Sequence, residues 1–133
     1  MARSRTFKLR LSPAGFDMLA DSHFWLVKST RRLLAWGTTL QVALDYLETL
    51  PAATVAHQFD LLADAGLSGS EVCFLGAPET MNDVAARIVR KIEHLSPGMP
   101  TPSLSQIYIL ALRQLGHADA EEVLHAYLRV GMR

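Results

Sequence analysis

A strand pattern followed by two helix patterns occurs twice along this chain, and this repetition limits its possible folds more than any other feature. Residues 6–12 alternate polar and apolar side chains, which predicts a half-buried strand. Ser12 and Pro13 then combine an N-cap with a proline in the first turn, so a helix is expected from there to about Trp36. The side chains expected to face the core from this strand and helix are Phe7, Leu9, Leu11, Phe16, Leu19, Ala20, Phe24 and Val27.

A second helix completes the first unit, which spans residues 5–50. Gly37 is expected to break the preceding helix, and Thr38 or Thr39 to cap the new one. The new helix has apolar residues at i, i+3, i+4 and i+7, which is typical of one buried helix face, and it ends near Leu50. This apolar stripe consists of Leu40, Ala43, Leu44 and Leu47.

Residues 51–69 are predicted to form a linker helix, which Gly66 ends, and a short loop. The second unit, residues 70–116, then opens with another short strand. We expect that strand to turn Val72 and Phe74 toward the core. Its outward side chains would then be Glu71, Cys73 and Leu75.

The helices of the second unit follow the same plan. The first is expected to start at residues 77–79, and the prolines of residues 96–102 require a loop after it. Ser103 or Ser105 can cap the next helix. The inward side chains expected from the two helices are Met81, Val84, Ala85, Ile88, Val89, Ile92, Tyr108, Ala111, Leu112 and Leu115.

The two units align at an offset of 65 for the strand and first helix, so that Leu19 meets Val84, and at an offset of 68 for the second helix. One unit alone cannot pair its strand edges or bury its stripes. We therefore expect a single domain over residues 1–133, mainly α with a short two-stranded antiparallel ribbon. A C-terminal helix over residues 117–133, with a capping box at Asp119 and Glu122, closes it.

This pattern resembles the ribbon-helix-helix family, the Arc and MetJ class of DNA-binding proteins. The residues that carry the resemblance are the strand Phe7–Pro13 and the helix pattern Leu40-x-x-Ala-Leu-x-x-Leu47. Their counterparts are Glu71–Pro78 and Ser103–Leu112. Members are usually homodimers of one unit, and a fused pair is similar to the tandem accessory proteins of conjugation and T-DNA transfer, the TraY and VirC types.

The resemblance implies that the ribbon enters the major groove of double-stranded DNA, where outward strand side chains read base edges. The implied base contacts are Thr6, Lys8 and Arg10. The N-termini of the second helices would clamp phosphates, and basic residues before the first strand would add phosphate contacts. The implied phosphate contacts are Arg3, Arg5, Thr38, Thr39, Ser103 and Ser105.

The expected function is therefore that of a non-catalytic, bacterial, cytoplasmic DNA-binding protein. It would serve as a plasmid or mobile-element transfer accessory factor, with relaxosome or other transfer proteins as further partners, or as a transcriptional repressor. The chain would be a monomeric pseudodimer or a higher homo-oligomer.

The distribution of charge agrees with a polyanionic partner. Residues 1–35 contain seven basic and two acidic side chains, a net charge of +5, and the rest of this neutral chain is correspondingly acidic.

The second strand departs from the family pattern, because Glu71 would face phosphates. Either recognition is asymmetric, or oligomers supply further basic strands, or the DNA role has been lost.

The sequence lacks the signatures of other classes. Cys73 has no acid–base partner nearby, the five histidines show no metal-ligand spacing, and there is no glycine-rich phosphate loop. We therefore expect no enzyme activity, cofactor or metal, and the absence of a long apolar run predicts no membrane span. The alternative function is a helical protein–protein adaptor, with a partner surface formed by Trp25, Leu26, Leu33 and Trp36.

Overall fold

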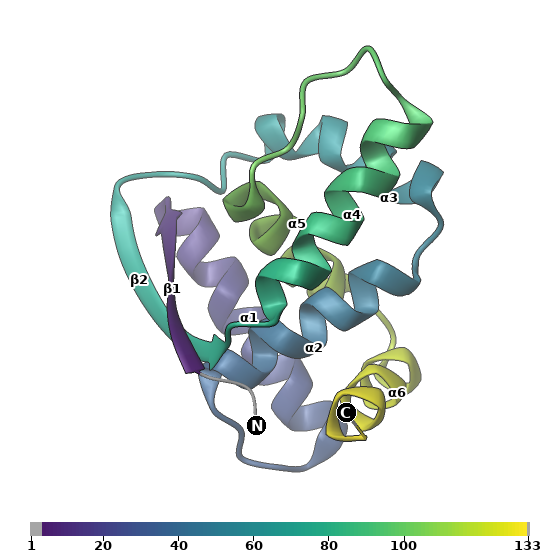
Figure 1. Cartoon of the computed structure of the whole chain (residues 1–133). Coiled ribbons are helices and arrows are strands. Elements are labelled where there is room, and N and C mark those ends of the chain that lie inside the picture. Colours follow the sequence, from purple (N-terminus) through teal and green to yellow (C-terminus); the bar gives the residue numbers. More distant parts are fainter. Residues whose placement is uncertain (1–3, 133) are drawn as a thin grey trace.

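The computed structural model of the chain describes residues 4–132; the candidate contact Arg3 lies outside this range. The molecule is mainly helical, with a two-stranded sheet on one side of the helices (Figure 1). Within residues 4–132, no helix has the length and apolar character needed to cross a bilayer. The elements in chain order are β1 (Ser4–Leu11), α1 (Pro13–Thr30), α2 (Trp36–Thr49), α3 (Ala52–Leu62), a 3₁₀ turn (Ala63–Ala65), β2 (Glu71–Pro78), α4 (Met81–Leu95), α5 (Leu104–His117) and α6 (Ala120–Gly131).

The two strands pair antiparallel, as predicted. Thr6 lies opposite Gly76, and Leu11 lies opposite Glu71, so residues 6–11 pair with residues 71–76. The alternation of β1 is also confirmed, because Phe7, Leu9 and Leu11 are buried and the residues between them are exposed. The ribbon therefore has one face on the core and one face in solvent.

The predicted faces of β2 are wrong. Val72 and Phe74 are exposed, whereas Leu75 and Ala77 are buried and Cys73 is half-buried. The strand also continues through Pro78, where a helix start was expected, and α4 begins only at Met81. The physical reason is the close packing of β2 on α2, which is the most extensive contact between a strand and a helix in the described residues.

The inward face of α1 is rotated by about one residue from the predicted one. Phe16 and Phe24 are exposed rather than buried, and Ala20 and Val27 are half-buried. Small and polar residues take their place because they find partners on other elements. The Ser22 hydroxyl donates a hydrogen bond to the Leu112 carbonyl, 2.7 Å away. The buried residues of α1 are Gly15, Leu19, Ser22, His23 and Leu26.

The predicted break between α1 and α2 is also displaced. Ser12 caps α1 as expected, by accepting a hydrogen bond from the Gly15 amide, but the helix ends at Thr30. Arg31 follows in the left-handed conformation with φ of 57°. Gly37 does not break a helix; it is buried in the first turn of α2, against the Gly76 carbonyl. A side chain at position 37 would collide with the strand backbone, so this position requires glycine.

The core forms where α2 and α5 pack together, and both predicted stripes on these helices are buried. Helix α1 packs more extensively on α5 than on the neighbouring α2, and α4 packs on α2 as well as on α5. Each half of the chain therefore contributes to the burial of the other half. This mutual burial makes the two strand–helix–helix segments one packing unit.

Burial repeats along the chain at an offset of 66 in the strands and first helices, rather than the predicted 65. Leu9 and Leu75 are both buried, as are Leu19 and Ala85. The offset of 68 for the second helices is confirmed by burial, because Ala43 and Ala111 are both inaccessible. Further buried pairs at these offsets are Leu26 and Ile92, Leu40 and Tyr108, Leu44 and Leu112, and Leu47 and Leu115.

Helix α6 packs on α1 and α2 and covers the remaining side of the core. Its predicted capping box is confirmed, since Asp119 accepts from the Glu122 amide at 2.8 Å. Arg129 of α6 forms an ion pair with the buried Asp45 of α2, with 2.8 Å between Nε and Oδ2. The Trp25 indole donates to the Ala118 carbonyl at 2.8 Å, which links α1 to the segment before α6.

Candidate nucleic-acid interface

The solvent side of the ribbon carries the three predicted base-contact residues. Thr6, Lys8 and Arg10 are all exposed there, because they alternate with the buried residues of β1. On β2 the same side carries Val72 and Phe74 in place of the predicted side chains. We define the outward ribbon face by its six residues, Thr6, Lys8, Arg10, Val72, Phe74 and Gly76.

Cross-strand pairing joins the two kinds of side chain on the outward ribbon face. Lys8 lies opposite Phe74, which is 64% exposed, and Arg10 lies opposite Val72, which is 39% exposed. Glu71 stands at the first position of β2, opposite the buried Leu11, and is not part of this face. The face combines two cations with two apolar side chains, and Glu71, which was expected to belong to it, lies outside it.

A hollow of about 330 Å³ with a mixed polar and apolar lining lies beside β1, where the strand meets α4 and α5. Four candidate contacts, Arg5, Thr6, Lys8 and Ser105, are brought together at this hollow. The N-terminus of α5 adds the partial positive charge of the helix dipole. The residues that line this β1 hollow are Arg5, Thr6, Phe7, Lys8, Asn82, Leu104, Ser105 and Tyr108.

Contacts between elements join residues that line the β1 hollow. The Tyr108 hydroxyl donates to the Asn82 side-chain oxygen, and the Tyr108 ring meets Phe7 edge-on at 5.5 Å. Burial raises the pKa of Tyr108 to about 12, so the phenol stays protonated and neutral at physiological pH. Ser103 caps α5, as one of the two predicted candidates, by accepting from the Gln106 amide at 3.2 Å. These contacts fix the helix N-terminus beside the strand.

An apolar hollow of about 430 Å³ occupies the corresponding place beside β2, at the N-terminus of α2. At the repeat offsets of 66 and 68, Phe74 in this hollow corresponds to Lys8 in the β1 hollow, and Gly37 corresponds to Ser105. Helix α2 has no side-chain hydrogen bond at its N-cap, Ala35. The residues that line this β2 hollow are Phe16, Leu19, Ala35, Trp36, Gly37, Cys73, Phe74, Leu75 and Gly76.

The predicted phosphate contacts at the start of α2 are not both accessible. Thr39 is fully buried, and its hydroxyl oxygen lies 2.7 Å from Nδ1 of the buried His23. Thr38 is half-buried in the first turn. The Trp36 ring stacks on His23, with 3.9 Å between ring centroids. The start of α2 therefore binds α1 instead of presenting a hydroxyl pair to solvent.

Stability is expected to fall as the pH is lowered, because burial lowers the pKa of His23 from its usual value of 6.5. Unfolding frees the ring to bind a proton, so the contribution of His23 is complete above 6.5 and is lost as the pH falls toward the lowered pKa. The melting temperature, measured from about pH 7.5 to 5.5, should drop more steeply in the parent than in His23→Asn. His117→Asn, at an exposed histidine, should keep the parental slope. Equal slopes in all three proteins would contradict this role.

The sequence prediction missed Phe74 and Asn82 as site residues. Phe74 was missed because β2 has apolar residues on both of its sides, so the sequence did not determine which side faces the core. For Asn82 there was no signal in the sequence, because a polar residue beside Asp83 is ordinary in the first turn of a helix. The proposed adaptor surface is also interrupted, because Leu26 is fully buried and Trp25 is half-buried, while Leu33 and Trp36 are exposed.

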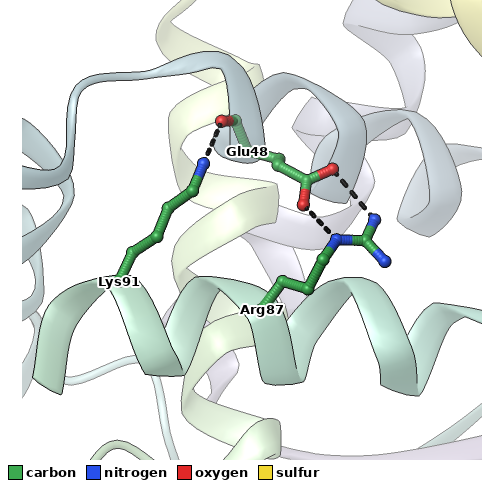
Figure 2. Close-up of polar contacts among 3 residues, drawn as sticks. All are labelled: Glu48, Arg87 and Lys91. Atoms are coloured by element: carbon green, nitrogen blue, oxygen red, sulfur yellow. Dashed lines mark hydrogen bonds and ion pairs between the residues drawn. The ribbon is translucent and has the colours of Figure 1, made fainter. Parts of the chain in front are cut away.

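A second basic cluster lies on α4, at i, i+3, i+4 and i+7, beside an open hollow of about 650 Å³. Figure 2 shows that Glu48, near the C-terminal end of α2, accepts hydrogen bonds from two residues of this cluster, Arg87 and Lys91. Arg87 donates to the Glu48 carboxylate from Nε at 2.7 Å and from Nη2 at 3.1 Å, and this hydrogen bonding raises the pKa of Arg87. Lys91 donates to the Glu48 backbone carbonyl at 3.2 Å. These bonds join α4 to the C-terminus of α2. The cluster is Arg87, Arg90, Lys91 and His94.

No known protein family, curated protein or solved structure matches this chain. The outward ribbon face and the two hollows beside it are therefore the features from which a function can be inferred.

Proposed function

We propose that the chain is a non-catalytic protein that binds double-stranded DNA by inserting the β1–β2 ribbon into the major groove, as a tandem ribbon-helix-helix protein. The observation that carries the proposal is the exposure of Thr6, Lys8 and Arg10 side by side on the outward ribbon face. The major groove admits a two-stranded ribbon, and the donors of Lys and Arg match O6 and N7 of guanine.

The packing of the helices supports this proposal. The strand–helix–helix order occurs twice, the two strands form one ribbon, and helices of each half pack on helices of the other. A ribbon held from below by the buried Phe7, Leu9 and Leu75 keeps its outward side chains in a fixed register. Such preorganisation reduces the entropy lost when the ribbon enters a groove.

The β1 hollow supplies the contacts that would orient the ribbon on the DNA backbone. Arg5 and Lys8 bring two positive charges to the N-terminus of α5, where Ser105 also lies. Phosphate oxygens suit such a place because the charges, the hydroxyl and the helix dipole all favour an anion. On this proposal the protein acts in the transfer of plasmid or mobile-element DNA, or represses transcription.

The test is a double variant of the outward ribbon face. We expect Lys8→Ala/Arg10→Ala to weaken binding to a selected duplex by at least about tenfold, because each such side chain accounts for ~1–3 kcal/mol of base discrimination. Binding by the parent should weaken by roughly tenfold or more between 50 and 200 mM salt, through its phosphate contacts. Both quantities follow from fluorescence anisotropy with a labelled duplex.

The matched control removes two positive charges elsewhere. Lys28→Ala/Arg32→Ala changes two exposed basic residues outside the outward ribbon face. It should bind DNA within about twofold of the parent, since long-range charge effects are screened by salt. Equal binding by the parent and the Lys8/Arg10 double variant would show that the ribbon is not the DNA-binding element.

A further inference from the structure

We infer that the two strands of the ribbon read different bases, with Lys8 and Arg10 contacting guanines and Phe74 contacting the 5-methyl group of a thymine. The DNA site would then be asymmetric. This inference rests on the proposed function and adds a specificity-determining residue to it. That residue is Phe74, whose side chain was expected from the sequence to face the core.

The exposure of Phe74 is the first observation. Its side chain is 64% exposed at the centre of β2, with the half-exposed Val72 two residues away on the same side. The strand buries Leu75 and Ala77 instead, so the core does not need Phe74. Adjacent large apolar side chains on an otherwise polar surface mark a contact site.

The charge around Phe74 indicates the kind of partner. Lys8 is its cross-strand neighbour and Arg10 pairs with Val72, while the six residues of the outward ribbon face include no carboxylate. A polyanion complements these cations, whereas an apolar protein surface would have to bury them unpaired. In the major groove the thymine 5-methyl is the apolar group available for contact with a phenyl ring.

The asymmetry follows from comparison of corresponding positions. Lys8 and Phe74 are 66 residues apart, the offset at which burial repeats between the halves. At the same offset Arg10 corresponds to Gly76, and Thr6 to Val72. A ribbon with two like strands would present cations to both halves of a palindrome, but this ribbon presents donors on one strand and apolar groups on the other.

The two hollows beside the ribbon show the same difference between a β1 side with polar donors and an apolar β2 side. The β1 hollow offers Arg5 and Ser105 at a helix N-terminus, whereas the β2 hollow offers Phe16 and Trp36 around Gly37. Phosphate contacts are therefore expected on the β1 side. The β2 side has to gain its affinity from apolar contacts to bases, which makes Phe74 the dominant residue there.

The experiment selects duplexes from a random library with the intact protein and then replaces each thymine of the selected site by deoxyuridine, which removes only the methyl group. We expect a non-palindromic site, in which one such replacement weakens binding by the parent about three- to tenfold. Phe74→Ala should bind the thymine and uracil forms equally, while Lys8→Ala keeps the discrimination. Phe74→Leu, which keeps an apolar contact, should retain part of it.

The other possible results separate failure of this inference from failure of the proposed function. Salt-dependent binding to a palindrome, or binding that no uracil replacement weakens, would overturn the inference and leave DNA binding intact. Equal discrimination by the parent and a folded Phe74→Ala variant would also overturn it. Failure of the parent to bind any duplex would overturn the proposed function together with the inference. Circular dichroism establishes folding of each variant, and the exposure of Phe74 predicts that all of them fold.

Discussion

Replacing Gly37 with alanine is expected to lower the free energy of unfolding by about 3 kcal/mol, the upper end of the usual range for overpacking. The added Cβ would lie 1.5 Å from the carbonyl oxygen of Gly76 and 2.7 Å from its carbonyl carbon. Both atoms belong to the backbone, so no side-chain rotation can relieve the contact. Helix α2 and strand β2 would have to separate, and the ribbon would lose its support on that side.

Gly76→Ala is the matched control, because the opposite glycine has open space where its Cβ would stand and does not have a positive φ. Its free energy of unfolding should stay within about 0.5 kcal/mol of the parent. Urea denaturation of the two variants measures the difference. Similar midpoints for both variants would mean that α2 does not approach the strand as closely as described.

Leu112→Ala is expected to lower the free energy of unfolding by about 2–5 kcal/mol. Leu112 is fully buried on α5, at the helix that packs against both α1 and α2. Truncation removes apolar contacts and leaves a cavity that these two helices cannot easily fill. Because the helices of both halves meet here, the loss should affect the whole chain in one cooperative transition.

A leucine in solvent provides the comparison for Leu112. Leu33 is 97% exposed in the loop after α1, so Leu33→Ala should change the free energy of unfolding by less than about 0.5 kcal/mol. Circular dichroism and tryptophan fluorescence should give coincident urea transitions for the parent and both variants. Transitions of the parent that differ between the two probes would show that the halves unfold separately.

The antiparallel ribbon and the stripes of α2 and α5 could be predicted from sequence because their periodicity is unambiguous. Strand β2 could not, since Val72 and Phe74 alternate with Cys73, Leu75 and Ala77, and both sets are apolar. The choice between sides depends on α2, whose approach at Gly37 leaves space for small residues such as Ala77.

The face of α1 shows a second limit of sequence patterns. Phe16 and Phe24 are more apolar than Ser22 and His23, yet the polar pair is buried. Burial of polar groups is tolerated when hydrogen bonds replace water, and here the partners are the Leu112 carbonyl and the Thr39 hydroxyl. These partners lie on other helices, so local periodicity contains no information about them.

The candidate site was predicted best where it depends on a single strand. The alternation of β1 was sufficient to place Thr6, Lys8 and Arg10 in solvent. Contacts that depend on two elements were less predictable, as Thr39 shows by turning into the core. Asn82 joins the β1 hollow only because α4 and α5 pack together there.

Both strands of the ribbon belong to the same covalent chain, and this has a consequence for how the molecule works at low abundance. Forming the ribbon needs no encounter between subunits, so it persists at any dilution at which the chain stays folded. Occupancy of a target by one such molecule would rise linearly at low protein levels rather than with the square of the amount. A substitution in one strand also leaves the other strand unchanged, so the two strands are free to diverge in sequence.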